Sequence, residues 1–515
     1  MVVGRHRRKP IGENGRTCHI SSPANPFLQL QPSSCTVSFD DCTFEALLRP
    51  APRQDGTRVA LPGVSQPARG SAEGARRGAA MENTDMGARQ KLDEMIFTTE
   101  MMLSMAQEKF LTGTLFNPMQ KALRSDPFPI YRKLREQAPI HRSYLADGWV
   151  LSRYADISAV LTDRGFGSDE RNLTRYPRME ARSRRAGIPS SYENGLSTML
   201  REDEPNHTRL RSLAAKAFTP RAVQSMRPQI EGLLEVAFKR VPTSGPFDLI
   251  STFAAPFPIA VIAGILGVPA SDWDRFYGWS EDIIKSIGDG DRDQRDVSEQ
   301  ARLELGDYLR GVANERRRDP RGDVLTSLVQ AEEEGDRLSS DELVAIATLL
   351  LVAGNETTTK LIGNSMLALL ENPDQLTRLR EQPERIPGAV EELLRFDGPV
   401  QLTSRVVLES RRFRGHDFRK GQQIILLLAS ANRDPAQFEE PDRLDVTRED
   451  CRHLAFSLGA HFCLGAKLAR LETSLALEAL ITRLPGLTLV PGGIDWGTNT
   501  ILRGPQRMML TVEPA

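Results

Sequence analysis

A single cysteine in a glycine-rich segment is the first candidate for chemistry in this sequence. The stretch FSLGAHFCLG, residues 456–465, places Cys463 between Gly459 and Gly465, two positions after His461. Leucines then recur at the spacing of a buried helical face, which predicts that Cys463 lies at the beginning of a helix. The unpaired N–H groups and the positive dipole end of a helix favour the thiolate over the thiol. Because the glycines leave room for a flat, bulky partner beside the backbone, the segment suits a cysteine that ligates a metal.

Two other interpretations of this cysteine stay open from the residues alone. A lone cysteine is by default an ordinary buried side chain that packs like a small apolar residue. Alternatively, Cys451, His453, His461 and Cys463 could form a zinc site. Structural zinc sites usually separate paired ligands by about two to four residues. In this chain one residue separates each pair, which disfavours zinc.

The segment around Cys463 resembles the haem-binding signature of the cytochrome P-450 family. The residues that carry the resemblance are Phe456, Gly459, the basic His461, the ligating Cys463 and Gly465. The family usually has glycine where this chain has Ser457. The resemblance implies that Cys463 is the axial ligand of the iron in haem b (heme b, iron protoporphyrin IX).

Three further motifs precede this segment in the order that the family shows. AGNET, residues 353–357, resembles the oxygen-activation motif, and EELLR resembles the paired Glu-x-x-Arg through Glu392 and Arg395. ANRDPAQFEEPDRLD resembles the meander, with Arg443 as third member of an ion-pair triad and Leu444 where an aromatic residue is more usual. Ordered motifs over roughly residues 111–512 are far more specific together than any one of them.

An acid and a hydroxyl, Glu356 and Thr357, interrupt a strongly apolar helical pattern in AGNETT. With the resemblance, Gly354 and Thr357 would open a local distortion of the helix where dioxygen can sit. Thr357 would hold a water molecule and Glu356 would relay protons from solvent. The alternative is that Thr357 bonds back to the carbonyl one turn earlier and Glu356 pairs with a surface cation.

The resemblance also assigns the other site residues. The haem propionates would be bound by basic side chains, namely His207, Arg211, Arg405 and His461. Further cofactor contacts would come from Gly354, Phe456, Gly459 and Gly465. A hydrophobic substrate pocket would be lined by Val352, Ala353, Val400, Leu402 and Ile501, although each is equally consistent with core packing. Glu392, Arg395 and Arg443 would have a structural role, clamping the loop below the haem.

The elements that position these residues are predominantly helical. Long helical patterns cover residues 205–218, 222–241, 298–318, 340–354 and 364–382. Strand patterns are few and cover residues 149–154, 404–408 and 422–428. The chain is therefore predicted to be mostly α with a small β part (α+β), as a single large haem-binding domain of cytochrome P-450 fold over residues 106–515.

Residues 1–105 differ from the rest of the chain. They mix proline, serine, glycine and arginine without sustained periodicity, a composition that does not bury enough apolar surface to fold. We predict an N-terminal extension that is disordered or results from a mis-assigned start, with Met81 as one candidate for the true start.

Composition limits the classes of function. The chain has 515 residues, 26% charged and 40% hydrophobic, with a formal net charge of -1, which is typical of a globular protein and disfavours nucleic acid as a partner. The largely apolar stretch 249–273 is interrupted by prolines, so no stable membrane insertion is predicted. Five cysteines are too few for a disulfide framework and indicate a reducing, cytoplasmic setting.

These expectations together predict a haem-thiolate monooxygenase of the soluble bacterial type, which inserts one atom of O2 into a hydrophobic small molecule. The chain has no glycine-rich dinucleotide fingerprint after a strand and no cysteine cluster for an iron–sulfur centre. Electrons from NAD(P)H would therefore arrive indirectly, through a separate ferredoxin and ferredoxin reductase. Lys467 and Arg470, just beyond the cysteine, could attract the ferredoxin. A peroxide-driven peroxygenase and a non-catalytic haem-binding protein are the alternatives.

Overall fold

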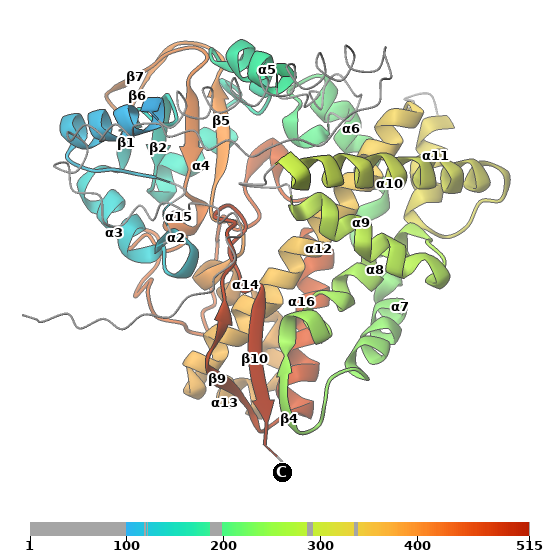
Figure 1. Ribbon diagram of the computed structural model, residues 1–515. Coiled ribbons are helices and arrows are strands. Elements are labelled where there is room, and N and C mark those ends of the chain that lie inside the picture. Colours follow the sequence, from blue (N-terminus) through green and yellow to red (C-terminus); the bar gives the residue numbers. More distant parts are fainter. Residues whose placement is uncertain are drawn as a thin grey trace, which may run out of the picture. The chain divides into compact units, whose positions relative to one another are not determined.

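The described part of the chain is mostly helical with small sheets (Figure 1). The computed structural model describes residues 99–117, 120, 122–185, 198–285, 292–333 and 338–513. The first helices with complete bounds are α2 Ala122–Ser125, α3 Phe128–Gln137, α4 Tyr154–Thr162, α5 Tyr176–Arg185, α6 Asn206–Ala215, α7 Pro220–Phe238, α8 Pro256–Leu266, α9 Trp273–Lys285, α10 Arg292–Arg318 and α11 Val324–Glu333. They are followed by α12 Ser340–Glu371, α13 Pro373–Glu381, α14 Ile386–Asp397, α15 Leu428–Ala431 and α16 Ala466–Arg483. The prediction of a mostly α protein with a small β part is confirmed.

Three sheets accompany the described helices. The largest has the strand order β1–β2–β8–β5–β3, formed by Ile140–Ser143, Gly148–Leu151, Gln423–Leu426, Thr403–Val407 and Phe166–Gly167. A second has the order β4–β10–β9, formed by Gly245–Asp248, Arg507–Val512 and Leu487–Asp495. The third pairs β6 Arg411–Phe413 with β7 His416–Phe418. The largest sheet thus joins strands from residues 140–167 to strands from residues 403–426.

The strand predictions were incomplete rather than misplaced. The segments 149–154, 404–408 and 422–428 overlap β2, β5 and β8. The other strands, β1, β3, β4, β6, β7, β9 and β10, were not predicted. Among them, β3 and β4 are short and pair with strands far away in the sequence, whereas the short β1 pairs with its neighbour β2. Strand formation depends on such partners more than on intrinsic preference, so short strands leave a weak local signal.

Helix α12 is the element around which the other helices are arranged. It begins with a capping box, in which Ser339 Oγ accepts from the N–H of Glu342 and the Glu342 carboxylate accepts from the N–H of Ser339. Helices α8, α9, α10, α14 and α16 all contact it, and Figure 1 shows α12 beside α16. The AGNETT segment is therefore held inside a helix that its neighbours fix in place.

The described chain begins with a helix over residues 99–112 that is tied to the largest sheet. Glu108 in this helix is fully buried, and its carboxylate accepts hydrogen bonds from the N–H groups of Phe116 and Tyr144 at 2.8 and 2.9 Å. It also accepts from Ser143 Oγ at the end of β1, at 2.9 Å. The boundary predicted at residue 106 falls inside this helix. Residues 1–98 of the predicted extension, Met81 included, lie outside the described residues.

None of the described helices combines the length and the hydropathy that a membrane span needs. The largely apolar stretch 249–273 divides into the π-helical turn Ile250–Ala254, helix α8 and the short turn Ala270–Asp272, before α9 begins. Helix α8 is buried almost all round, as expected of an apolar helix in a protein core.

Candidate functional site

A cavity lies between helices α6, α12 and α16, strand β5 and the loop that precedes α16. The space that protein atoms leave free there, its open mouth included, is about 1580 Å³. The predicted site residues that line it are His207, Arg211, Ala353, Gly354, Thr357, Val400, Arg405, Phe456, His461, Cys463 and Gly465. The fold therefore brings most of the predicted site residues around one space.

Cys463 lies between the short turn Gly459–His461 and the beginning of α16. Its N–H donates to the carbonyl of Phe456 at 2.9 Å, which closes the loop beneath the thiol. Burial raises the pKa of the thiol, and this outweighs the hydrogen bond from Gly465 and the charges of Arg211 and Arg470, which lower it. The helix terminus alone therefore does not produce the predicted thiolate. A metal cation on the sulfur would, because a coordinating thiol loses its proton.

The glycines around the cysteine have different physical roles. Gly459 has a φ of +73°, and a Cβ there would lie 2.4 Å from the carbonyl oxygen of Leu161 at the end of α4. Glycine is therefore required here because a neighbouring helix lies so close. The sequence had instead suggested that this glycine makes room for a cofactor. A Cβ at Gly465 would meet no atom within 4 Å, so this glycine does leave open space. Ser457 has a φ of 61°, a left-handed conformation that explains why glycine is usual there in the family it resembles.

Four basic side chains gather at the cavity, as predicted. The rings of His207 and His461 stack with their centroids 4.0 Å apart. Arg211 Nη2 donates to the carbonyl of Phe462 at 2.5 Å, and Arg405 Nη1 donates to the carbonyl of Ser404 at 2.8 Å. Neither guanidinium forms an ion pair with a carboxylate of the described residues. Their positive charge is therefore available to an anionic group in the cavity.

The two histidines are not the cations that were predicted at this edge of the cavity. Burial, followed by the charges of Arg405, His207 and Arg211, lowers the pKa of His461 to about 3. Burial and then Arg211 also lower the pKa of His207. Both rings are therefore neutral near pH 7 and would serve an anion as hydrogen-bond donors. His461 Nε2 lies 3.0 Å from Ser168 Oγ, and the buried His207 Nε2 has no hydrogen-bond partner among the described residues.

The predicted substrate residues separate into two groups. Ala353 and Val400 line the cavity. Val352 and Leu402 instead pack against hydrophobic clusters of the core, and Ile501 is 43% exposed. These last three assignments are corrected, since an apolar residue type does not reveal which face of its element it occupies. Apolar residues that line the cavity and were not predicted include Ile262, Leu349 and Phe218.

Of the acid and the hydroxyl predicted in α12, the hydroxyl lines the cavity and the acid lies beside it. Thr357 lines the cavity, and its Oγ1 donates to the carbonyl of Ala353 at 2.6 Å, as the alternative interpretation expected. Glu356 pairs with Lys360, whose Nζ lies 3.1 Å from Glu356 Oε1. Lys360 is 3% exposed, so this cation is buried where the alternative expected a surface cation. Helix α12 is α-helical throughout residues 340–371, so the predicted distortion at Gly354 is not a break in the helix.

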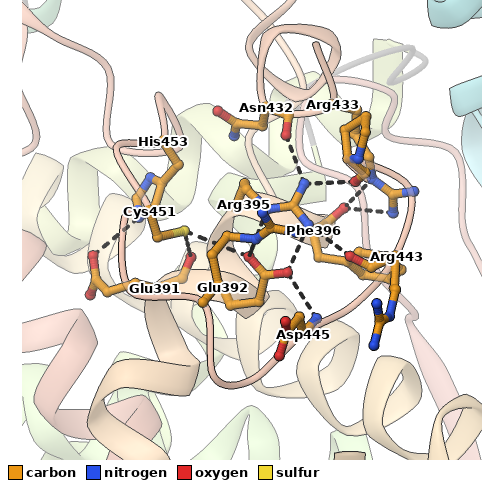
Figure 2. Close-up of polar contacts among 12 residues, drawn as sticks. Glu391, Glu392, Arg395, Phe396, Asn432, Arg433, Arg443, Asp445, Cys451 and His453 are labelled. Carbon is orange, nitrogen blue, oxygen red and sulfur yellow. Dashed lines mark hydrogen bonds and ion pairs between the residues drawn. The ribbon is translucent and has the colours of Figure 1, made fainter. Parts of the chain in front are cut away.

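The buried ion pair of α14 is confirmed, but its third member is corrected. The guanidinium of Arg395 donates two hydrogen bonds to Glu392, at 2.6 and 2.7 Å, with both residues almost fully buried (Figure 2). Arg448 adds a third contact to Glu392 at 3.0 Å. The side chain of Arg443 pairs instead with Glu440 at the surface, and only its main-chain carbonyl accepts a bond from Arg395, at 3.1 Å. Arg448, five residues later in the chain and just beyond the meander motif, thus makes the contact predicted for Arg443.

A second acid of α14 binds one of the two predicted docking cations. Glu391 accepts hydrogen bonds from Arg470 at 2.6 and 2.7 Å and contacts His453 at 3.2 Å. Burial would raise the pKa of Glu391, but the bonds from Arg470 and His453 lower it to about 2. Arg470 is thus committed to an internal ion pair, whereas Lys467 is exposed.

A buried acid in the cavity wall was not predicted from the sequence. Glu472 of α16 lines the cavity, is 3% exposed, and its Oε2 has no hydrogen-bond partner among the described residues. Burial raises the pKa of this carboxyl group well above its ordinary value. A signal was present, because Glu472 lies one turn after Leu468 on the apolar face of the predicted helix.

The zinc interpretation does not fit the geometry. No group of three or more potential metal ligands occurs among the residues that the structure describes. Cys451 lies 3.3 Å from the carbonyl of Glu391 and 3.7 Å from the carboxylate of Glu392, away from the cavity that Cys463 lines. Figure 2 shows Cys451 and His453 facing the two acids of α14.

The residues around the cavity fit a haem. A thiol lies at the base of α16, two arginines without paired carboxylates and a histidine nitrogen without a partner lie nearby, and the rest of the lining is mainly apolar. This donor set matches a flat apolar ring with two carboxylates at its edge and a metal that accepts sulfur.

Comparisons with known proteins agree with this fit. The family model described as Cytochrome P450 matches residues 292–488. Vitamin D(3) 25-hydroxylase of Pseudonocardia autotrophica is 40% identical over 395 residues, which are 76% of this chain and 94% of that protein. The 6-deoxyerythronolide B hydroxylase of Saccharopolyspora erythraea is 37% identical over 397 residues, which are 74% of this chain and 96% of that protein.

A solved structure extends the likeness to the fold. Cytochrome P450 PksS of the Bacillus subtilis 168 bacillaene polyketide synthase has a TM-score of 0.71 and 36% identity, covering 78% of this chain and 100% of that chain. Both the sequence and the arrangement of elements are thus shared over nearly the whole length of the relatives. The chain therefore belongs to the cytochrome P450 family of haem-thiolate monooxygenases, which use haem b and draw electrons from NAD(P)H through redox partners.

Proposed function

We propose that this chain is a ferredoxin-dependent monooxygenase that oxidises a hydrophobic small molecule in the cavity beside α12. One observation carries the proposal. A thiol, Cys463, and a helical hydroxyl, Thr357, line the same cavity, although more than a hundred residues separate them in the sequence. The thiol is suited to ligate iron, and the hydroxyl is suited to hold a proton near the molecule that binds to this iron.

Each residue of the site has a separate task in this proposal. Cys463 would ligate the iron, while Arg211 and Arg405, with His207 and His461 as hydrogen-bond donors, would hold the propionates. When bound, the haem supplies the reductive activation of O2, of which one atom enters the substrate and the other leaves as water. Thr357 would hold the last proton donor at the cavity wall, and Glu356 would bring protons to it from the outer side of α12.

The substrate class follows from the cavity wall and from the relatives. The lining of Ile262, Leu349, Leu350 and Val400 excludes water and supports an apolar substrate. Two relatives are named for the hydroxylation of vitamin D3 and of 6-deoxyerythronolide B. Steroid-like compounds and macrolactones are therefore the first to test, by following the spin state of the ferric haem as each compound is added.

The source of electrons is tested directly. Product formation with NAD(P)H, ferredoxin, its reductase and O2 should greatly exceed product formation with peroxide alone. A higher yield with peroxide would instead favour the peroxygenase, and no product with either donor would favour a non-catalytic haem protein. A cytoplasmic location belongs to the same proposal, since the two described cysteines, Cys451 and Cys463, are free thiols.

Thr357 is expected to control how much of the reducing power reaches the product. In Thr357→Ala, haem and substrate should still bind, while product per NAD(P)H falls by about tenfold and peroxide rises, because a positioned proton donor is lost. The measurement is product, peroxide and cofactor consumption in one reaction. Thr377→Ala is the matched control, since Thr377 makes the same bond back to a carbonyl one turn earlier, at 2.8 Å, on the exposed helix α13. Equal product yields in both variants would contradict the assignment.

A further inference from the structure

Lys360 is a buried lysine that the reaction proposed above does not yet use. It lies one turn after Glu356 in α12 and is 3% exposed. Lysine is almost never buried unless its charge is paired, because transferring an ammonium group out of water is costly. A buried lysine beside a catalytic site therefore requires a physical account.

The structure gives this ammonium group one partner. Nζ of Lys360 lies 3.1 Å from Oε1 of Glu356, and no other described side chain forms an ion pair with it. The acid precedes the base by four residues along the helix, which is the favourable orientation for such a pair. The Glu356 side chain is 16% exposed, so neither charge has much water around it. Removing either partner would leave the other as an uncompensated buried charge.

The stem of Lys360 is also held in place. A Cβ added to Gly504 would lie 2.7 Å from Cβ and 2.9 Å from Cγ of Lys360, so the lysine stem lies directly on the main chain of this glycine. Gly504 belongs to the segment between β9 and β10, outside the helical core. The ammonium group thus has a fixed position rather than the freedom of a surface lysine.

The position of the pair relative to the cavity is set by the helix. Residues Ala353, Gly354, Thr357 and Thr358 of α12 line the cavity, whereas Glu356 and Lys360 do not. Glu356 is the chain neighbour of Thr357, yet its carboxylate is directed along the helix to Lys360. It influences Tyr277 of α9 as well, where burial and the charges of Glu281 and Glu356 raise the pKa of the phenol to about 12. Glu281 is exposed and accepts a hydrogen bond from Tyr277 at 2.8 Å, so this flank of α12 leads towards solvent.

We propose that Lys360 is the positioning residue of the proton relay, holding the carboxylate of Glu356 at the flank of the cavity between Thr357 and the solvent side of α9. The inference rests on the function proposed above. In the closed pair, the carboxylate of Glu356 faces Lys360 and does not line the cavity. A proton taken up by Glu356 weakens its attraction to Lys360, which frees the carboxyl group to turn towards Thr357.

The first test concerns the product obtained per electron. In Lys360→Met, which keeps the length of the stem and removes the charge, the ratio of product formed with ferredoxin and O2 to product formed with peroxide should fall by about tenfold. Lys360→Arg should recover most of that ratio, because it restores the positive charge. Arg227→Met is the control, since Arg227 and Glu231 form an ion pair one turn apart on α7, at 2.7 Å, in the reverse order and about half exposed.

The second test needs no turnover. The stability of the haem-loaded protein is measured for Lys360→Met, Glu356→Gln and the double variant. The double variant should be more stable than Lys360→Met alone, since it contains no unpaired carboxylate. Additive effects would show that the two groups are not coupled and would overturn the proposal.

The outcomes separate this inference from the function on which it depends. An unchanged ratio in Lys360→Met overturns the positioning role, and so does an equal loss with both oxidants, which indicates general damage. If the unchanged protein forms no product with ferredoxin and O2, the proposed function fails. The stability cycle still decides in that case whether Lys360 holds Glu356.

Discussion

Cys463→Ala is expected to abolish both the red-displaced Soret band of the reduced carbon monoxide complex and the oxygen-dependent formation of product. The band arises from sulfur that donates electron density to the iron, and alanine has no atom that replaces it. The structure offers no second thiol in the cavity, since Cys463 alone of the described cysteines lines it. The measurement is a difference spectrum of the reduced protein before and after carbon monoxide is added, together with haem content per chain.

Cys451→Ala provides the control for this experiment. Cys451 is also a free, half-buried thiol, but it contacts Glu391 and Glu392 of α14. Burial, and then the charge of Glu392, raises its pKa to about 12, so it is not a ready ligand. The variant should keep the red-displaced band. If Cys463→Ala kept the band as well, the assignment of the axial ligand would be wrong, and the roles assigned to Thr357, Glu356 and Lys360 would lose their basis.

Glu392→Gln is expected to have the largest effect on stability. The substitution keeps the shape of the side chain and removes the charge that balances Arg395, whose side chain has no exposed surface. Breaking a buried ion pair on one side costs about 3–5 kcal/mol of unfolding free energy, because the remaining charge is uncompensated. Arg448→Met should cost less, since Arg448 makes one contact with Glu392 and keeps 15% of its side chain exposed. Urea denaturation, followed by circular dichroism and haem absorbance, measures both.

Arg443→Met distinguishes the observed cluster from the predicted one. The Arg443 side chain is 61% exposed and pairs with Glu440, which is 64% exposed. Such surface pairs contribute little to stability, so the midpoint in urea should not move. A loss comparable to that of Glu392→Gln would restore Arg443 as the third member of the triad. A loss in Arg448→Met alone would confirm Arg448 as the third member of the cluster.

The sequence motifs identified residues that line one cavity, but they did not identify every ion-pair partner correctly. Cys463, Thr357, Arg211 and Arg405 were assigned from their types and motif context, and the structure places all four at one cavity. Arg443 was assigned in the same way and proved wrong. Arg443 in the meander and Arg448 just beyond it are equivalent in type, and the path of an irregular loop decides which side chain reaches Glu392.

The same limit applies to the pocket. Val352 and Ala353 are consecutive and apolar, but a helix directs consecutive side chains to different faces, so that Ala353 alone lines the cavity. Ile501 lies in an irregular segment, where residue type gives no direction at all. Substrate specificity therefore depends on information that composition and spacing do not contain.

Local interactions explain why helices and the motif order could be inferred without coordinates. The apolar period of α16 acts within a few residues along the chain. The lowered pKa of His461, the raised pKa of Glu472 and the pairing of Lys360 with Glu356 could not be inferred in this way. They depend on burial, and burial is a property of distant segments packed together. A charge is inexpensive in water and costly in a core, so the state of each ionisable group became defined only when the chain had folded around it.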